Sequence, residues 1–249
     1  VQAAGIVDEL VAPFPAHVKL AAPEGAEITT LIVNCCRAGC DHASDARLLI
    51  EHAADIHAGI ALVQHALGAS QTIVAIEDDL SSAAEALLAS QKCCATTTVA
   101  KSQSTQRGEK EIVKEMLGKA VPKRGLAAQV GAVVFGLGTV AQIGALLPAG
   151  EGLTEQVITI SGPGVEHPGN YRVAIGTPFQ FALRHAGVSD HAAEVVLSGP
   201  KVSSSVLELN APITKGVTGI VVSTQPNWPQ QEKARLSCDR VYMEDDGNE

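Results

Sequence analysis

Short apolar runs alternate with longer amphipathic segments through the first 150 residues of the chain. The apolar runs are rich in β-branched residues, and the segments after them repeat apolar residues every three or four positions, which is typical of strands alternating with helices. We expect strands at 29–34, 71–77, 95–101 and 130–135. We expect helices at 44–67, 81–90, 108–118 and 139–147. This alternation predicts an α/β fold with a mainly parallel sheet and helices on its faces.

The pattern changes after Glu151. The segments QVITISG, GNYRVAIGT, AEVVLSG and SSVLELN are short, β-rich and bounded by turns, and PFQFALRHAG (178–187) has a helical pattern. This predicts a small α+β domain, with the boundary near Gly150. The expected domains are therefore 1–150 and 151–224, followed by a polar tail over 225–249.

An uncharged segment from Gly125 to Gly150 is long enough to cross a membrane. It contains several glycines, two glutamines and Pro148, so we interpret it as a buried strand, a turn and a helix. We therefore expect no transmembrane segment in the chain.

The net charge and the cysteine content limit which functions and which cellular compartment the sequence favours. The net charge is −9 and aromatic residues make up 3% of the chain, which argues against nucleic-acid binding because that needs a basic, stacking surface. No N-terminal stretch has the order of a signal peptide, so the six cysteines are expected as reduced thiols in the cytoplasm.

A glycine motif in the uncharged segment has the spacing of a dinucleotide-binding loop. Gly136, Gly138 and Ala141 fit the pattern G-x-G-x-x-A between an apolar run and a possible helix. That fingerprint also requires an acidic residue about twenty positions later, at the end of the next strand. The next strand ends in ITISG and has no carboxylate there, so we do not assign a dinucleotide fingerprint.

Several separate stretches, taken in order, resemble one family. They are PFPAHVKL (13–20), TLIVN, AIEDD (75–79), RGEKEIVKEMLGKAVP (107–122), GLGTV (136–140) and VITISGPGVEHPGNYRVAIGTP (157–178). In this order the chain resembles RnfC, a component of the Rnf electron-transport complex that is similar to the flavoprotein subunit of respiratory complex I. The resemblance implies a Rossmann-like domain for FMN and NADH, followed by a β-grasp, SLBB-like domain. It also implies partner subunits and a peripheral place on the cytoplasmic face of the cell membrane.

The resemblance also implies a set of cofactor-binding residues. Lys19 could meet a flavin phosphate, although a solvated surface lysine is the simpler interpretation. Gly108 and Glu109 match a glycine–glutamate turn at the start of a helix. Such a turn either binds an anion at the helix N-terminus or forms an acidic first turn that complements the helix dipole. The other matching positions are Asn34, Asp45, Gly138 and Thr139. No catalytic residue is assigned.

The chain departs from the family at several of the same places. Where the flavin loop is glycine-rich in the family, this sequence has Asp8, Leu10, Val11 and Pro13. Asp8 adds negative charge beside the expected phosphate, and Pro13 removes a backbone donor. Positions that carry carboxylates in the family hold Arg37 and Gly39, and Gly136 stands where an asparagine is expected.

Metal sites are not expected either. Cys35, Cys36, Cys40 and His42 lie close together, but no second Cys/His pair at zinc spacing accompanies them. Where the family begins its iron–sulfur cysteines, Cys238 alone fits, and a four-iron cluster needs four thiolates.

Two functions from different classes follow from these observations. The first is an RnfC-like oxidoreductase component, in which NADH would reduce a flavin that passes electrons to iron–sulfur clusters. The second is a cofactor-free structural or docking subunit that keeps the same scaffold because it packs against partners. A diverged relative with no activity is a third possibility.

Overall fold

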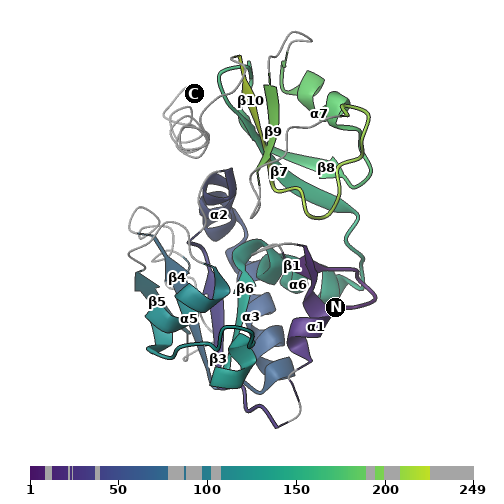
Figure 1. Cartoon of the computed structure of the whole chain (residues 1–249). Coiled ribbons are helices and arrows are strands. Elements are labelled where there is room, and N and C mark those ends of the chain that lie inside the picture. The colour runs from purple at the N-terminus through teal and green to yellow at the C-terminus, as the bar shows by residue number, and fades with distance from the viewer. Residues whose placement is uncertain are drawn as a thin grey trace. The chain divides into compact units, whose positions relative to one another are not determined.

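The computed structural model describes residues 1–8, 13–21, 23, 25–36, 40–77, 87, 97–101, 108–188, 194–198 and 208–224. The chain divides into two compact units, formed by Val1–Arg37 with Asp45–Leu153 and by Ala38–Ser44 with Thr154–Glu249. Each unit has its own four-stranded sheet (Figure 1). Each unit also has its own cluster of buried hydrophobic residues.

The first unit is built on a parallel sheet, as the sequence pattern predicts. Its strands are β3 (Thr30–Asn34), β4 (Gln71–Ile76), β5 (Thr97–Lys101) and β6 (Ala132–Gly136), in the order β5-β4-β3-β6. The chain moves outward from β3 to β4 and β5, and then returns to the other side of β3 as β6. In open α/β sheets, ligands bind beyond the carboxyl ends of the strands where the order reverses in this way. Here that place is the edge where β3 and β6 end.

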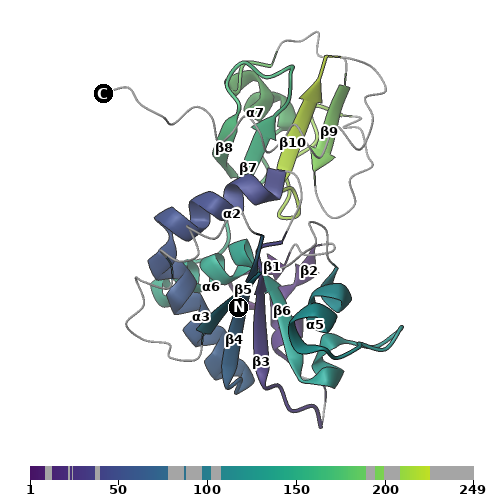
Figure 2. The same ribbon diagram turned by 90° about the vertical axis from the view of Figure 1, so that its left-hand side faces the viewer.

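Helices cover both faces of this sheet. Helices α3 (Ala53–Leu67) and α6 (Leu137–Ala149) lie on one face, and α5 (Glu109–Leu117) lies on the other (Figure 2). Every residue of β3 and of β6 is buried, as expected for near-continuous apolar runs in a parallel sheet covered on both sides.

The uncharged segment is an ordinary part of this core. It forms the short 3₁₀ helix η2 (Ala127–Val130), then β6 and α6, which confirms the interpretation as a buried strand, turn and helix. Among the described residues, every helix is too short or too polar to traverse a bilayer.

Helices α3 and α6 pack with their backbones in direct contact at two glycines. A Cβ atom added to Gly144 would lie 1.8 Å from the carbonyl oxygen of Asp55, and one added to Gly59 would lie 2.0 Å from that of Val140. Real Cβ atoms do not approach other heavy atoms so closely, so only glycine permits this helix separation.

One predicted helix is wrong in its extent. The pattern predicts a single helix over 44–67, whereas the structure has α2 (Cys40–Glu51) and α3, separated at His52 (φ −118°, ψ 29°). The backbone hydrogen bonds continue on both sides of the break, from His52 N to Leu48 O and from Ile56 N to His52 O, each 3.0 Å long. The apolar repeat therefore runs across the break and does not reveal it. The helix expected at 81–90 lies outside the described residues, except for Leu87.

The N-terminal segment forms a small hairpin that enters a helix. Strand β1 (Val7–Asp8) pairs antiparallel with β2 (Phe14–Pro15), and α1 (Ala16–Leu20) follows directly. Residues 9–12 of the loop between the two strands, which include Leu10 and Val11, lie outside the described residues.

From Thr154 onward, the described residues form a mixed sheet with helix α7 (Phe179–His185) packed against it, which confirms the predicted β-grasp, α+β arrangement. Its strands β7 (Glu155–Ser161), β8 (Gly169–Ala174), β9 (Glu194–Ser198) and β10 (Gly219–Ser223) have the order β8-β7-β10-β9. The central strands β7 and β10 are parallel, and both outer strands are antiparallel to their neighbours. Helix α7 buries Phe179, Ala182 and Leu183 in the core.

Strand β10 is absent from the sequence prediction, which places the last strand of this unit at 204–210 instead. Residues 201–207 lie outside the described part, and residues 209 and 210 form a turn. The run VTGIVVS (217–223) is rich in β-branched residues, which is a strand signal that the sequence prediction missed.

Candidate functional site

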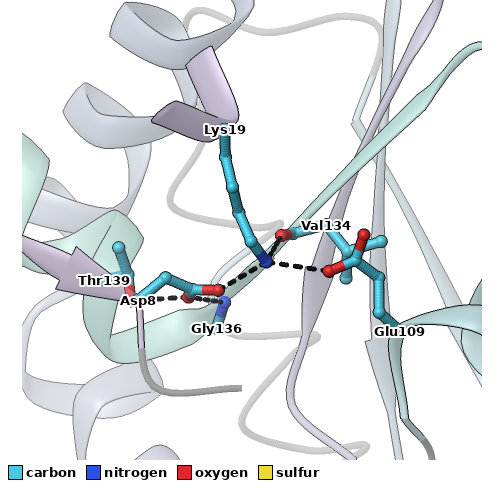
Figure 3. A network of polar contacts seen from close by, with 6 residues as sticks. All are labelled: Asp8, Lys19, Glu109, Val134, Gly136 and Thr139. Carbon is cyan, nitrogen blue, oxygen red and sulfur yellow. Dashed lines mark hydrogen bonds and ion pairs between the residues drawn. The ribbon is translucent and has the colours of Figure 1, made fainter. Parts of the chain in front are cut away.

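The carboxylate of Asp8 lies at the edge where β6 ends and α6 begins. Its Oδ1 accepts hydrogen bonds from the backbone N–H of Gly136 at 3.0 Å and from the hydroxyl of Thr139 at 2.9 Å (Figure 3). Gly136 is the residue before α6 and has an extended backbone (φ −68°, ψ 152°). The first N–H groups of a helix have no partner within the helix and carry partial positive charge, so a carboxylate is favoured there. Only 1% of Asp8 is exposed, so this carboxylate is enclosed by the protein.

Lys19 of α1 extends to the other oxygen of Asp8. Its Nζ donates to Asp8 Oδ2 at 2.7 Å, to Glu109 Oε2 at 2.9 Å and to the backbone oxygen of Val134 at 2.9 Å. An ammonium group has three N–H donors, so these acceptors use all of them. The same Nζ lies 5.6 Å from the centroid of the Phe135 ring, within the range of a cation–π contact.

We call the six residues of Figure 3 the Asp8–Lys19–Glu109 network: Asp8, Lys19, Glu109, Val134, Gly136 and Thr139. Burial on its own lowers the pKa of Lys19, but the negative charges of Asp8 and Glu109 and their hydrogen bonds outweigh it, so the pKa is raised above its ordinary value of 10.5. The lysine is therefore charged at neutral pH, and the three ionisable groups together carry one net negative charge when both carboxylates are ionised.

The glycine–glutamate turn supplies a carboxylate to this network. Gly108 precedes α5 with an extended backbone (φ −61°, ψ 166°), and Glu109 begins the helix. Glu109 and Glu111 form an acidic first turn, which complements the helix dipole. The Glu109 side chain also forms the ion pair with Lys19, a role that neither of the two sequence interpretations includes.

Asn34 ends β3 next to the network. It is paired in register with Gly136, and it is fully buried. Its Oδ1 accepts a hydrogen bond from the backbone N–H of Cys36 at 2.9 Å. Its Nδ2 is buried and has no acceptor in the part of the chain that the structure describes. A buried amide donor without a partner is costly, so this atom is a candidate contact for a ligand at the sheet edge.

The structure brings three of the seven residues suggested by the sequence into one network: Lys19, Glu109 and Thr139. The other four, Asn34, Asp45, Gly108 and Gly138, are not members of it. Asp45 is a buried residue of α2, and Gly138 lies in the first turn of α6. A Cβ added to Gly138 would meet a side-chain atom of Leu48 at 3.9 Å, which is an ordinary contact. The spacing of the glycine motif therefore does not reflect a close backbone approach at this glycine.

The structure describes only some of the side chains of the cysteine–histidine cluster, which the sequence does not favour as a metal site. Cys35 and Cys36 are buried, whereas nothing is described of the side chains of Cys40 and His42. Over the described ranges, no group of three or more His, Cys, Asp and Glu side chains could hold a metal ion. Cys238 lies in the tail beyond the described residues.

Both units match known domain families. A family model described as the Nuo51 FMN-binding domain matches residues 1–145. A second model, the SLBB domain, matches residues 157–197. The two matches follow each other in the same order as the two units of the structure.

Curated relatives match nearly the whole chain. It is 34% identical over 234 residues to the C subunit of the ion-translocating oxidoreductase complex of Rhodobacter capsulatus, covering 92% of this chain and 45% of that protein. It is 32% identical over 243 residues to the C subunit of the proton-translocating ferredoxin:NAD(+) oxidoreductase complex of Clostridium ljungdahlii, covering 96% of this chain and 53% of that protein. The chain thus spans about half the length of these relatives.

Solved structures share the fold. The chain of an NAD+-reducing [NiFe]-hydrogenase in the air-oxidised state matches with a TM-score of 0.64 and 19% identity, covering 89% of this chain and 45% of that one. The sequence resemblance to RnfC agrees with the curated relatives. Because the first family model spans residues 1–145 of 249, more than half of the sequence, the chain belongs to the Nuo51 FMN-binding domain family.

Proposed function

We propose that this chain is an RnfC-like component of a membrane-associated electron-transport complex, in which it serves as a docking scaffold and not as a flavin carrier. Membership in such a complex is supported by relatives that are named as components of ion-translocating oxidoreductase complexes and match more than nine-tenths of the chain. The scaffold role rests on the Asp8–Lys19–Glu109 network. The proposed partners are the other subunits of the complex, and the proposed place is the cytoplasmic face of the membrane.

The described residues do not fit the phosphate of FMN. A phosphate monoester needs N–H and O–H donors with positive charge nearby, and the network contains such donors on Gly136, Thr139 and Lys19. All three already bind the carboxylate of Asp8. A phosphate would bring further negative charge beside Asp8 and Glu109, and like charges so close disfavour ionisation of both groups.

An iron–sulfur cluster is not part of this proposal. The segment from residue 225 to residue 249 contains one cysteine, Cys238, and a four-iron cluster needs four thiolates.

A redox role is the second candidate, and one observation favours it. The buried Nδ2 of Asn34 has no acceptor among the described residues, and it lies at the sheet edge where this fold class holds its ligands. A flavin or nicotinamide ring could supply such an acceptor without using the donors around Asp8.

Purification of the chain from its native membranes tests both parts of the proposal. A tagged chain is expected to co-purify with membrane-embedded subunits, because a scaffold works by binding them. After it is separated from those subunits in denaturant-free buffer, it is expected to release no FMN on acid treatment, as measured by fluorescence. Absence of membrane subunits would contradict membership in the complex. Stoichiometric FMN on the separated chain would contradict the scaffold role and support the redox role.

A further inference from the structure

Three donors from two distant parts of the chain converge on one carboxylate. They are the backbone N–H of Gly136, the hydroxyl of Thr139 and the ammonium of Lys19, at 3.0, 2.9 and 2.7 Å from the oxygens of Asp8 (Figure 3). A helix N-terminus, a hydroxyl and a lysine are together the donor set that recognises a phosphate group. In this chain the anion that they bind is a side chain of the protein itself.

We propose that Asp8 is an internal substitute for a ligand phosphate, and that its carboxylate excludes FMN from a domain whose remaining donors would accept the phosphate. This inference rests on the proposed scaffold function and deepens it, because it names the residue that keeps a flavin out. Its independent support is the family model of an FMN-binding domain, which covers the whole network within residues 1–145.

The two anions cannot share these donors. Asp8 is 1% exposed, so its carboxylate has no room to turn into solvent without moving the end of β1. Lys19 has used its three N–H groups on Asp8, Glu109 and Val134, and none is left for a phosphate oxygen. FMN therefore binds only when the Asp8 carboxylate is removed or displaced.

Removing the carboxylate leaves the other donors in place. In an Asp8→Gly variant the N–H of Gly136 and the hydroxyl of Thr139 are free, and one N–H of Lys19 is released. Lys19 keeps its ion pair with Glu109 at 2.9 Å, so its ammonium stays paired in the empty site. In an Asp8→Asn variant the amide oxygen can still accept from Gly136 and Thr139, but the negative charge is gone.

Calorimetric titration of the whole chain with FMN and with riboflavin tests the inference. We expect Asp8→Gly to bind FMN at least about tenfold more tightly than the wild type, a difference of about 1.4 kcal/mol. Riboflavin, which lacks the phosphate, should show no such gain. Asp8→Asn should show a smaller gain, and it keeps the test valid if Asp8→Gly does not fold. The matched control is Glu111→Gln, which removes the same charge from an exposed position outside the network.

Each outcome of the titration has a separate meaning. Equal FMN affinity in the wild type and both Asp8 variants overturns the inference and leaves membership in the complex untouched. An equal gain for riboflavin also overturns it, because the effect would then come from added space. A gain in Glu111→Gln as large as in the Asp8 variants overturns it as well, since net charge alone would explain the result. Tight FMN binding by the wild type overturns both this inference and the scaffold role.

Discussion

Replacing Gly144 with alanine is expected to lower the free energy of unfolding by about 3 kcal/mol, because the new methyl group has no space. Its Cβ would lie 1.8 Å from the carbonyl oxygen of Asp55 and 2.6 Å from the backbone nitrogen of Gly59. Both are backbone atoms of α3, so no side-chain rotation relieves the overlap. The two helices must separate, and the packing of both on the sheet is lost in part. Urea unfolding followed by circular dichroism measures the change.

The matched control is Gly138→Ala, on the same helix α6. Among the described residues, a Cβ there meets a side-chain atom of Leu48 at 3.9 Å, an ordinary contact, and alanine has a higher helix propensity than glycine. We expect this variant to be as stable as the wild type or slightly more stable. If Gly144→Ala were as stable as Gly138→Ala, the close packing of α3 and α6 would be wrong.

Replacing Lys19 with methionine is expected to destabilise the chain by about 3 kcal/mol, because it leaves the buried Asp8 carboxylate without its cation. Asp8 is 1% exposed and faces Glu109 across the lysine, so the variant holds two like charges with nothing between them. The double variant Asp8→Asn with Lys19→Met should recover most of the loss, since it removes the unpaired charge as well. Lys114→Met, at an exposed position of α5, is the control and should change stability little. A loss in the double variant equal to that in Lys19→Met would contradict the ion-pair explanation.

The stability difference between the wild type and Lys19→Met should depend on pH in a way that follows from the raised pKa of Lys19. Its folded-state pKa lies above the ordinary 10.5, since Asp8 and Glu109 outweigh the effect of burial. The stability that the charged lysine contributes is therefore complete below about pH 10.5 and is lost as the pH rises through the higher folded-state pKa. The difference in unfolding free energy between wild type and Lys19→Met should stay constant from neutral pH to about pH 10 and shrink above that. A difference that already shrinks below about pH 10 would mean that burial, and not the two carboxylates, determines the folded-state pKa of Lys19.

The arrangement of strands and helices is largely predictable because it depends on local patterns. Apolar runs separated by amphipathic segments give the parallel sheet, and the change after Glu151 gives the second, α+β unit. The break at His52 is not predictable, because the apolar repeat continues through it and leaves no signal in the sequence. The backbone hydrogen bonds on both sides of the break are also those of a helix.

The contacts of Asp8 depend on the fold and leave no trace in local sequence. Asp8 is 128 residues from Gly136 and 131 from Thr139, and these contacts form only because β1 lies at the end of β6. The sequence alone presents Asp8 as a negative charge beside a phosphate, whereas the structure shows it binding the donors themselves. The same holds for Gly59 and Gly144, which look like ordinary helix glycines until α3 and α6 are placed together.

A crystal structure of the wild-type chain grown with excess FMN tests the central claim most directly. We predict that Asp8 Oδ1 remains within hydrogen-bond distance of Gly136 N and Thr139 Oγ1, and that no phosphate lies beside Lys19 Nζ. A phosphate bound to Lys19 Nζ and Gly136 N, with the Asp8 carboxylate turned away, would contradict the account.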